Sequence, residues 1–392
     1  MTGDVLCLSH LRWGFVYQRP NHLMSRCARD RRVFFVEEPH FDVDEPFLDI
    51  QPVENGLHLA IPHLPPGQAP DVVERMQREL VDSLVARMSV RDPLLWFYTP
   101  MALGHVRHLQ PSAVVYDCMD ELSHFQGAPP ELVERERELF KAADLVFTGG
   151  QSLFEAKRSH HPHVHAFPSS VERAHYEHAR QHAGDPADQA GIPHPRLGFF
   201  GVVDERMDID LVAAIADARP DFHVVIVGPI VKIDPARLPR RPNLHWLGGK
   251  TYKELPAYIG GWDVAIMPFA RNDATKFISP TKTLEYLAAG KPVVSTSIRD
   301  VVRPYGEEGL VRIADTAEDF VTAIDAALAE RGTLAESAHA EARDAMLGQT
   351  SWDATWVRMQ RLVTGAAALR EHGAVTRKRG FRKEEETTCS TT

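Results

Sequence analysis

The fold is decided by residues 279–296, whose sequence is SPTKTLEYLAAGKPVVST. This stretch predicts a capped helix of about ten residues followed by a buried strand. Ser279 suits the N-cap, Pro280 suits the first helical position, and Gly290 can adopt the left-handed conformation that ends a helix. The apolar residues at helical spacing, which predict the buried face, are Leu284, Leu287 and Ala288.

Two charged residues lie on another face of this helix. Lys282 and Glu285 are three positions apart, so both can reach one ligand. A lysine in the first turn is unfavourable beside the positive end of the helix dipole unless an anion binds there. One interpretation is a phosphate site made by Lys282 and the first-turn amides, with Glu285 accepting hydrogen bonds from ribose hydroxyls. The other is a solvent-exposed ion pair.

Length and composition predict a two-domain soluble protein. The chain has 392 residues, of which 44% are hydrophobic and 25% charged. Its net charge of −10 argues against binding to nucleic acid. We expect a cytoplasmic protein, because neither a signal peptide nor a membrane-spanning stretch is visible, and a peripheral contact with the inner face of the membrane stays open. The four cysteines lack metal-site spacing and predict reduced thiols.

Short apolar runs alternate with helical periodicity along most of the chain, which is typical of parallel sheets covered on both faces. The first series of runs predicts strands at Val5–Leu8, Val33–Val36, Leu94–Tyr98, Ala113–Tyr116, Leu145–Thr148 and Val164–Phe167. The second predicts strands at Leu197–Gly201, Phe222–Gly228, Leu244–Leu247, Val264–Met267 and Pro292–Thr296. Helices are expected at about 20–30, 70–89, 100–109, 130–143, 151–159, 207–217, 251–260 and 280–289.

The two series predict an α/β protein made of two doubly wound domains. The first covers residues 1–178 and is completed by a C-terminal helix at 350–371, and the second covers 196–349. A linker is expected at 179–195, where Gly, Pro, Ala, Asp and His are frequent, and a disordered polar tail at 372–392. Ligands of such sheets bind beyond the carboxyl ends of the strands, so a cleft between the domains is expected.

The first strand runs into a loop with a glycine and two arginines. Gly14 would let backbone amides approach an anion, and Arg12 and Arg19 would add positive charge. A plain strand-to-helix connection explains the loop equally well. The GxGxxG pattern is absent, which disfavours a dinucleotide-dependent oxidoreductase.

Three carboxylates follow the strand at Ala113–Tyr116. Asp117, Asp120 and Glu121 lie at its end, where a carboxylate desolvated beside others acquires a raised pKa and can serve as a general base. The alternative is that Asp117 or Asp120 caps the turn.

The second domain offers a matching strand end. Gly201 ends a strand, and Arg206 is placed to meet a diphosphate opposite Lys282. A surface ion pair of Arg206 with Asp208 or Asp210 is the alternative. The histidines at 160–165 lack the spacing and partners of a metal site, and no metal is expected.

These stretches together resemble the nucleotide-sugar glycosyltransferases of the GT-B fold. Residues 143–148 with Ser152, and residues 167–176, are similar to a passage of the family-4 transferases, and residues 284–294 are similar to their donor-binding helix. Within that group the chain looks closest to teichuronic-acid-type bacterial transferases. The resemblance implies two Rossmann-like domains facing a cleft, with the C-terminal helix crossing back to the first domain. It also implies donor-binding residues: Gly14, Gly201, Arg206, Lys282, Thr283 and Glu285.

The family pattern is not complete. The second glutamate of the Glu-x7-Glu signature is Glu285, whereas the first position is Phe277. The histidine of the retaining enzymes is replaced by Met119 or Asp120. The run at 115–123 instead resembles inverting glucuronosyltransferases of xanthan assembly, whose aspartate is the base, and this resemblance implies the same role for Asp120.

The sequence therefore predicts a metal-independent transferase that needs no cofactor. Its donor would be a nucleotide-diphosphate sugar, with a UDP-sugar favoured, and its acceptor a glycan, a lipid-linked molecule or a small molecule. Two alternatives stay open: a sugar-nucleotide epimerase of the same fold, and a non-catalytic protein that binds sugar nucleotides.

Overall fold

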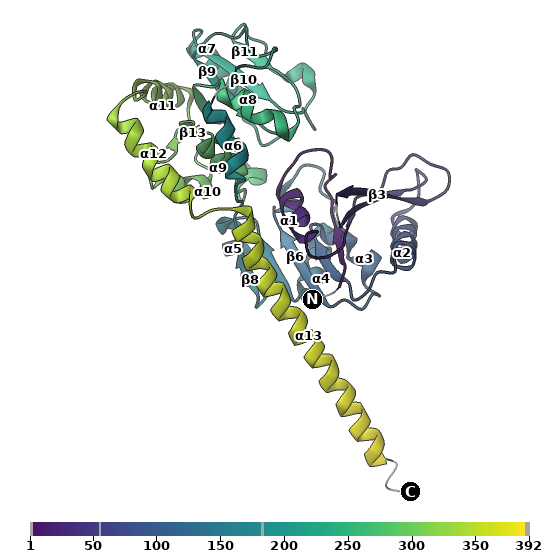
Figure 1. Cartoon of the computed structure of the whole chain (residues 1–392). Helices are drawn as coiled ribbons and strands as arrows, with labels where there is room; N and C mark the ends of the chain where they lie inside the picture. The colour runs from purple at the N-terminus through teal and green to yellow at the C-terminus, as the bar shows by residue number, and fades with distance from the viewer. Residues whose placement is uncertain (1–2, 55, 182–183, 389–392) are drawn as a thin grey trace.

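The computed structural model describes residues 3–54, 56–181 and 184–388, and within them the chain forms two separate α/β domains (Figure 1). The first sheet has the strand order β3-β4-β2-β1-β5-β6-β7-β8. Its strands are β1 (Val5–Leu8), β2 (Val33–Val36), β3 (Phe47–Glu54), β4 (Leu57–His63), β5 (Leu94–Phe97), β6 (Ala113–Cys118), β7 (Leu145–Thr148) and β8 (Val164–Ala166). The helices between them are α1 (Arg19–Cys27), α2 (Pro70–Arg87), α3 (Leu103–Val106), α4 (Leu132–Ala142) and α5 (Gln151–Lys157).

The second sheet has the order β11-β10-β9-β12-β13-β14, and its strand pairs are parallel. Its strands are β9 (Arg196–Phe200), β10 (His223–Val227), β11 (Leu244–Trp246), β12 (Val264–Met267), β13 (Val293–Ser295) and β14 (Arg312–Ile313). The helices of this half are α6 (Arg173–Glu177), α7 (Ile209–Ala218), α8 (Leu255–Gly260), α9 (Thr281–Ala288), α10 (Arg299–Val301), α11 (Ala317–Ala329) and α12 (Leu334–Leu347). Every strand that the sequence predicted is present.

The hairpin of β3 and β4 was not predicted. It is antiparallel and extends the otherwise parallel first sheet beyond β2. Most of β3 is exposed and carries charged residues, so it lacks the apolar run that marks the buried strands. Pro52 is tolerated there because β3 is an edge strand, where a missing N–H costs no ladder bond.

The buried strands β1, β2, β5, β6 and β7 divide their side chains between two cores. In β1, Val5 and Cys7 point into one hydrophobic cluster, and Leu6 and Leu8 point into the other. This alternation explains why all four residues are apolar, since a strand covered on both faces has no solvent side.

The predicted linker is in part an element of the second domain. Gln189 is fully buried, and its side-chain amide donates to the Tyr258 carbonyl at 3.0 Å and accepts from the Trp262 indole N–H at 3.0 Å. Amino-acid composition cannot show that a polar residue will hydrogen-bond two buried groups. For this reason the composition of residues 179–195 predicted a linker.

The C-terminal helix α13 (Trp352–Thr388) crosses back to the first domain, as predicted (Figure 1). Its apolar face joins the first-domain core through Trp352, Trp356, Met359 and Val363. The helix continues to Thr388 and projects away from the domains, so the prediction of a disordered tail from residue 372 is wrong as far as residue 388. Arg, Lys and Glu are good helix formers, and they extend a helix that packing has already nucleated. Residues 389–392 of the predicted tail lie outside the described residues.

No helix in the described part of the chain is long and apolar enough to cross a membrane.

Replacing Trp352 by alanine tests the anchoring of α13. Trp352 is 1% exposed, and its ring stacks on His22 of α1 at 4.7 Å. We expect Trp352→Ala to lower the free energy of unfolding by about 3–5 kcal/mol, the cost of emptying a large core site. Urea denaturation measures it, with Val357→Ala on the exposed side of α13 as the control. Equal stability of the two variants would contradict the anchoring role.

Candidate active site

A cleft of about 1210 Å³ lies between the two domains. The ends of β1 and β6 and the loops that follow them line one wall, and the ends of β9 and β10 with the start of α9 line the other. The predicted cleft at the carboxyl ends of the strands is therefore confirmed. The predicted site residues that line it are Gly14, Asp120, Gly201, Arg206, Lys282 and Glu285.

The helix α9 begins one residue later than predicted. Pro280 occupies the N-cap position, so the assignment of Ser279 as N-cap is wrong, and the helix covers Thr281–Ala288. Gly290 has a φ of +77°, as expected for the residue that ends the helix. The predicted buried face is confirmed, because Leu284, Leu287 and Ala288 are all at most 2% exposed.

Lys282 points into the cleft without a carboxylate partner among the described residues. Its ammonium lies 5.7 Å from the ring centre of Phe199 and 5.9 Å from that of Phe200. Burial lowers the pKa of Lys282, while the nearby Glu285 carboxylate acts in the opposite direction. Gly201 makes room for this side chain, since a Cβ there would lie 2.2 Å from the Lys282 Cε.

Glu285 is buried, which excludes the solvent-exposed ion pair. Its side chain is within the cleft wall, and the residue is 7% exposed. The Tyr176 hydroxyl donates to its Oε1 at 2.9 Å, whereas its Oε2 has no hydrogen-bond partner among the described residues. Burial raises the pKa of Glu285, and Lys282 opposes that shift. The free oxygen can accept a hydrogen bond from a ligand hydroxyl.

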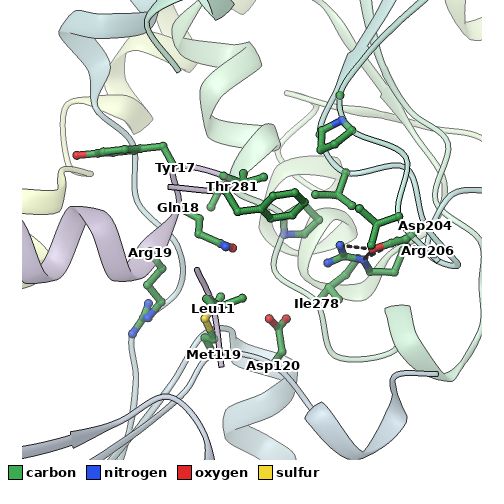
Figure 2. Close-up of a pocket in the computed structure, with 18 of the residues that line it drawn as sticks. Leu11, Tyr17, Gln18, Arg19, Met119, Asp120, Asp204, Arg206, Ile278 and Thr281 are labelled. Carbon is green, nitrogen blue, oxygen red and sulfur yellow. Dashed lines mark hydrogen bonds and ion pairs between the residues drawn. The ribbon is translucent and has the colours of Figure 1, made fainter. Parts of the chain in front are cut away.

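Arg206 is held by Asp204, not by the partners that the sequence suggested. Its Nε and Nη2 donate to the two Asp204 oxygens at distances between 2.6 and 3.1 Å (Figure 2). The alternative pairing with Asp208 is wrong, because the Asp208 carboxylate caps α7 by accepting from the Leu211 N–H at 2.8 Å. Pairing with Asp210 is likewise not formed. The Nη1 of Arg206 makes no hydrogen bond within the described chain, so it stays available to a ligand.

Asp120 differs from the two carboxylates beside it. Asp117 is fully buried in a bidentate ion pair with Arg19, and Glu121 is 2.7 Å from the ammonium of Lys157. Asp120 has no such partner among the described residues, and its carboxylate points into the cleft (Figure 2). Burial raises the pKa of Asp120 to about 6, although Arg206 and Arg19 oppose the shift. A carboxylate of this kind can accept a proton near neutral pH.

The two arginines predicted to add positive charge to the first loop are both bound to protein groups. Arg12 donates to Glu37 and to the backbone carbonyls of Glu38 and Pro39, and Arg19 is committed to Asp117. Arg19 nevertheless lines the cleft and lowers the pKa of Asp120. Gly14 does line the cleft, but nothing lies within 4 Å of a Cβ at that position, so no close approach requires a glycine there.

Thr283 is not a cleft residue. It is fully buried, and its hydroxyl contacts the sulfur of Met267 at 3.7 Å inside the domain core. The threonine of α9 that lines the cleft is Thr281, one turn before Glu285 (Figure 2). The Thr283 side chain therefore does not face the cleft, and donor binding by this residue stays a prediction.

Sequence reasoning did not assign roles to several lining residues. His10 lies just after β1, and Lys232 lies in the loop after β10. Phe125 of the first domain lies near two cations of the second, 5.5 Å from the Arg206 guanidinium and 5.8 Å from the Lys232 ammonium. A polar residue within two positions of the end of a buried strand is the signal that could have singled out His10, whereas the Phe125 contacts depend on how the domains face each other.

The part of the chain that the structure describes contains no group of three or more His, Cys, Asp or Glu side chains able to hold a metal ion. In the 160–165 segment, His161 is used locally, since its Nδ1 accepts from the His163 N–H and its Nε2 donates to the Ala143 carbonyl.

Two facing Rossmann-like domains joined by a helix that crosses back define a protein of the GT-B fold. Residues 194–330, in the second domain, match the family model described as Glycosyl transferases group 1. A Bacillus subtilis protein, provisionally named teichuronic acid biosynthesis glycosyltransferase TuaH, is 29% identical over 238 residues. That match covers 56% of this chain and 59% of the relative.

Solved structures with low sequence identity share the fold. Sucrose-phosphate synthase from Thermosynechococcus elongatus is 15% identical with a TM-score of 0.71, and the match covers 94% of this chain and 100% of that one. Anabaena HepE, solved with UDP and glucose, is 14% identical with a TM-score of 0.65, over 92% of this chain and 99% of that one.

The electrostatics of the cleft can be tested without a substrate. Arg206 lowers the pKa of Asp120, so we expect Arg206→Ala to raise that pKa above about 6, both by removing the cation and by freeing the Asp204 carboxylate. A 13C NMR titration of the aspartate side chains, assigned with Asp120→Asn, measures the change. Arg219→Ala serves as the control, because Arg219 pairs with Asp221 and Asp325 outside the cleft. An unchanged or lower pKa in Arg206→Ala would rule out this coupling.

Proposed function

We propose that the protein is a glycosyltransferase that moves a sugar from a nucleotide-diphosphate sugar to an acceptor hydroxyl. The observation that carries the proposal is the pairing of Lys282 and Glu285 on one face of α9. Among the described residues, the Lys282 ammonium has no carboxylate partner and the Glu285 Oε2 has no hydrogen-bond partner, and both residues line the same cleft. A nucleoside diphosphate carries the complementary groups, namely a phosphate anion and ribose hydroxyls.

Charge on the leaving diphosphate would be balanced by protein groups. Lys282 and the free Nη1 of Arg206 would contact the phosphates, and Glu285 would accept from a ribose hydroxyl. We propose that these cations make the reaction independent of a metal and that no further cofactor takes part. UDP is the favoured nucleotide, because the solved structure of Anabaena HepE, which shares the fold, contains UDP.

Asp120 is proposed as the base of an inverting displacement. It would take the proton of the acceptor hydroxyl while that oxygen forms a bond to the anomeric carbon. The bond from the anomeric carbon to the diphosphate oxygen breaks in the same step, and its electron pair stays on the diphosphate. The acceptor, a glycan, a lipid-linked molecule or a small molecule, would lie mainly on the first-domain wall.

The donor site is tested by calorimetric titration with UDP, GDP and dTDP in the presence of EDTA. We expect one nucleotide to bind, and Lys282→Ala to weaken it about 10- to 100-fold, as expected for a lost charge-assisted hydrogen bond. Lys276→Ala is the control, because Lys276 is exposed, lies just before α9 and is not in the cleft. If no nucleotide binds, or if both variants bind like the wild type, the donor site is wrongly placed.

The role of Asp120 is tested with Asp120→Asn. We expect this variant to keep nucleotide affinity and to lose transfer by at least about 100-fold, the usual contribution of a general base. In the wild type kcat/KM should fall as the pH drops below about 6, because this ratio reports the free enzyme, in which Asp120 is then protonated. Sugar transfer at the wild-type rate in Asp120→Asn would show that Asp120 is not the catalytic base. A new epimer formed from the donor alone would instead indicate an epimerase.

A further inference from the structure

His10 lies on the first-domain wall of the cleft with one ring nitrogen unused. It lies two residues after the end of β1, and its Nδ1 lies 3.1 Å from the backbone carbonyl of Tyr98, just after the neighbouring strand β5. A carbonyl only accepts, so Nδ1 must carry the proton. The Nε2 then holds a lone pair, and it has no hydrogen-bond partner among the described residues.

The ring is neutral at physiological pH. Burial lowers the pKa of His10 to about 4, the hydrogen bond to Tyr98 acts in the opposite direction, and the ammonium of Lys232 lowers the pKa further. Besides burial, the groups that shift this pKa are therefore the Tyr98 carbonyl of the first domain and Lys232 of the second. Nε2 is thus an acceptor and not a donor between pH 5 and 8.

The position of His10 in the sheet relates it to the proposed base. β5 separates β1 from β6, so the ends of β1 and β6 are two strand spacings apart, or about 10 Å. Asp120 lies just after β6. A sugar ring fits within this interval, so one bound sugar can reach both side chains.

We propose that His10 is a sugar-binding residue of the cleft, whose Nε2 accepts a hydrogen bond from a ring hydroxyl of the substrate. The inference rests on the proposed function and adds to it a residue that selects hydroxylated rings. The hydroxyl belongs either to the sugar of the donor or to the acceptor, and the chemistry of the contact is the same in both cases. His10 orients that substrate, whereas Asp120 takes the proton.

The experiment compares the wild type with His10→Phe, which keeps a ring but removes both nitrogens, and His10→Gln, whose amide oxygen can accept near the Nε2 position. His105→Phe is the matched control, because burial lowers the pKa of His105 to about 4 as well, yet His105 lies on α3 outside the cleft. The first arm measures by calorimetry how much more tightly UDP-glucose binds than UDP. The second measures binding of p-nitrophenyl β-D-glucoside to UDP-saturated protein by saturation-transfer NMR.

We expect His10→Phe to bind one of the two sugar ligands, UDP-glucose or the glucoside, about fivefold to tenfold more weakly, which corresponds to the loss of one hydrogen bond. Its affinity for UDP alone should be unchanged. The affected arm identifies the source of the hydroxyl. His10→Gln should recover part of the loss. In Asp120→Asn, which removes the cleft carboxylate whose pKa is about 6, the glucoside signal should stay constant from pH 5 to 8. Wild-type binding by His10→Phe in both arms overturns the proposal, and so does a loss of glucoside binding by Asp120→Asn as the pH falls from 7 to 5.

The two proposals fail in different ways. Absence of UDP binding in the wild type removes the proposed donor site. In that case the glucoside arm, run on nucleotide-free protein, still decides whether His10 binds a sugar.

Discussion

The buried ion pair between Arg19 and Asp117 holds the first-domain wall together. Arg19 begins α1, Asp117 lies in β6, and a third donor of Arg19 reaches the Phe167 carbonyl just after β8 at 2.7 Å. Both side chains are at most 1% exposed, so removing either partner would leave an uncompensated charge in the core. One contact therefore fixes three segments that are distant in sequence. The ion pair also occupies the Asp117 carboxylate. Glu121 pairs with Lys157, so among the described residues Asp120 is the carboxylate after β6 that has no ion-pair partner.

The opposite wall depends on the close approach of backbones. Gly201 has a φ of +142° and lies against the Lys282 side chain, and a Cβ at Gly228 would be 1.8 Å from the Gly201 carbonyl oxygen. Contacts across the cleft then set the two walls relative to each other. Tyr17 stacks on Tyr252 at 4.3 Å, and the Asp300 carboxylate accepts from the Ser152 N–H at the start of α5. Residues of both domains thus assemble the site.

Sequence reasoning succeeded where a residue's role follows from periodicity. The helix of Lys282 and Glu285, and its position before a buried strand, could be derived because capping and apolar spacing are local properties. The same rule could have excluded Thr283 from the cleft face, since it is four residues before the buried Leu287, and could have favoured Thr281, which is four before Glu285.

Ion-pair partners could not be derived in this way. The partner of Arg19 is 98 residues away, and nothing in either local sequence indicates that the two side chains meet. Arg206 illustrates the same limit at short range, because Asp204, Asp208 and Asp210 are all near in sequence and only the turn geometry selects Asp204. The β3–β4 hairpin escaped prediction for a different reason, since an exposed edge strand needs no apolar run.

The charges of the two walls are coupled through the cleft. Lys282 and Arg206 both lower the pKa of Asp120, so in the empty cleft they weaken it as a base. Under the proposed function, a bound diphosphate would neutralise these two cations and add negative charge of its own. The pKa of Asp120 would then rise, and the carboxylate would become a stronger base only when the donor is in place. After the acceptor oxygen has formed its bond to the sugar, the proton on Asp120 stabilises a cleft that holds a free diphosphate. Donor binding and proton transfer therefore favour each other, which is the coupling that a transferase needs to avoid activating an acceptor before a donor is bound.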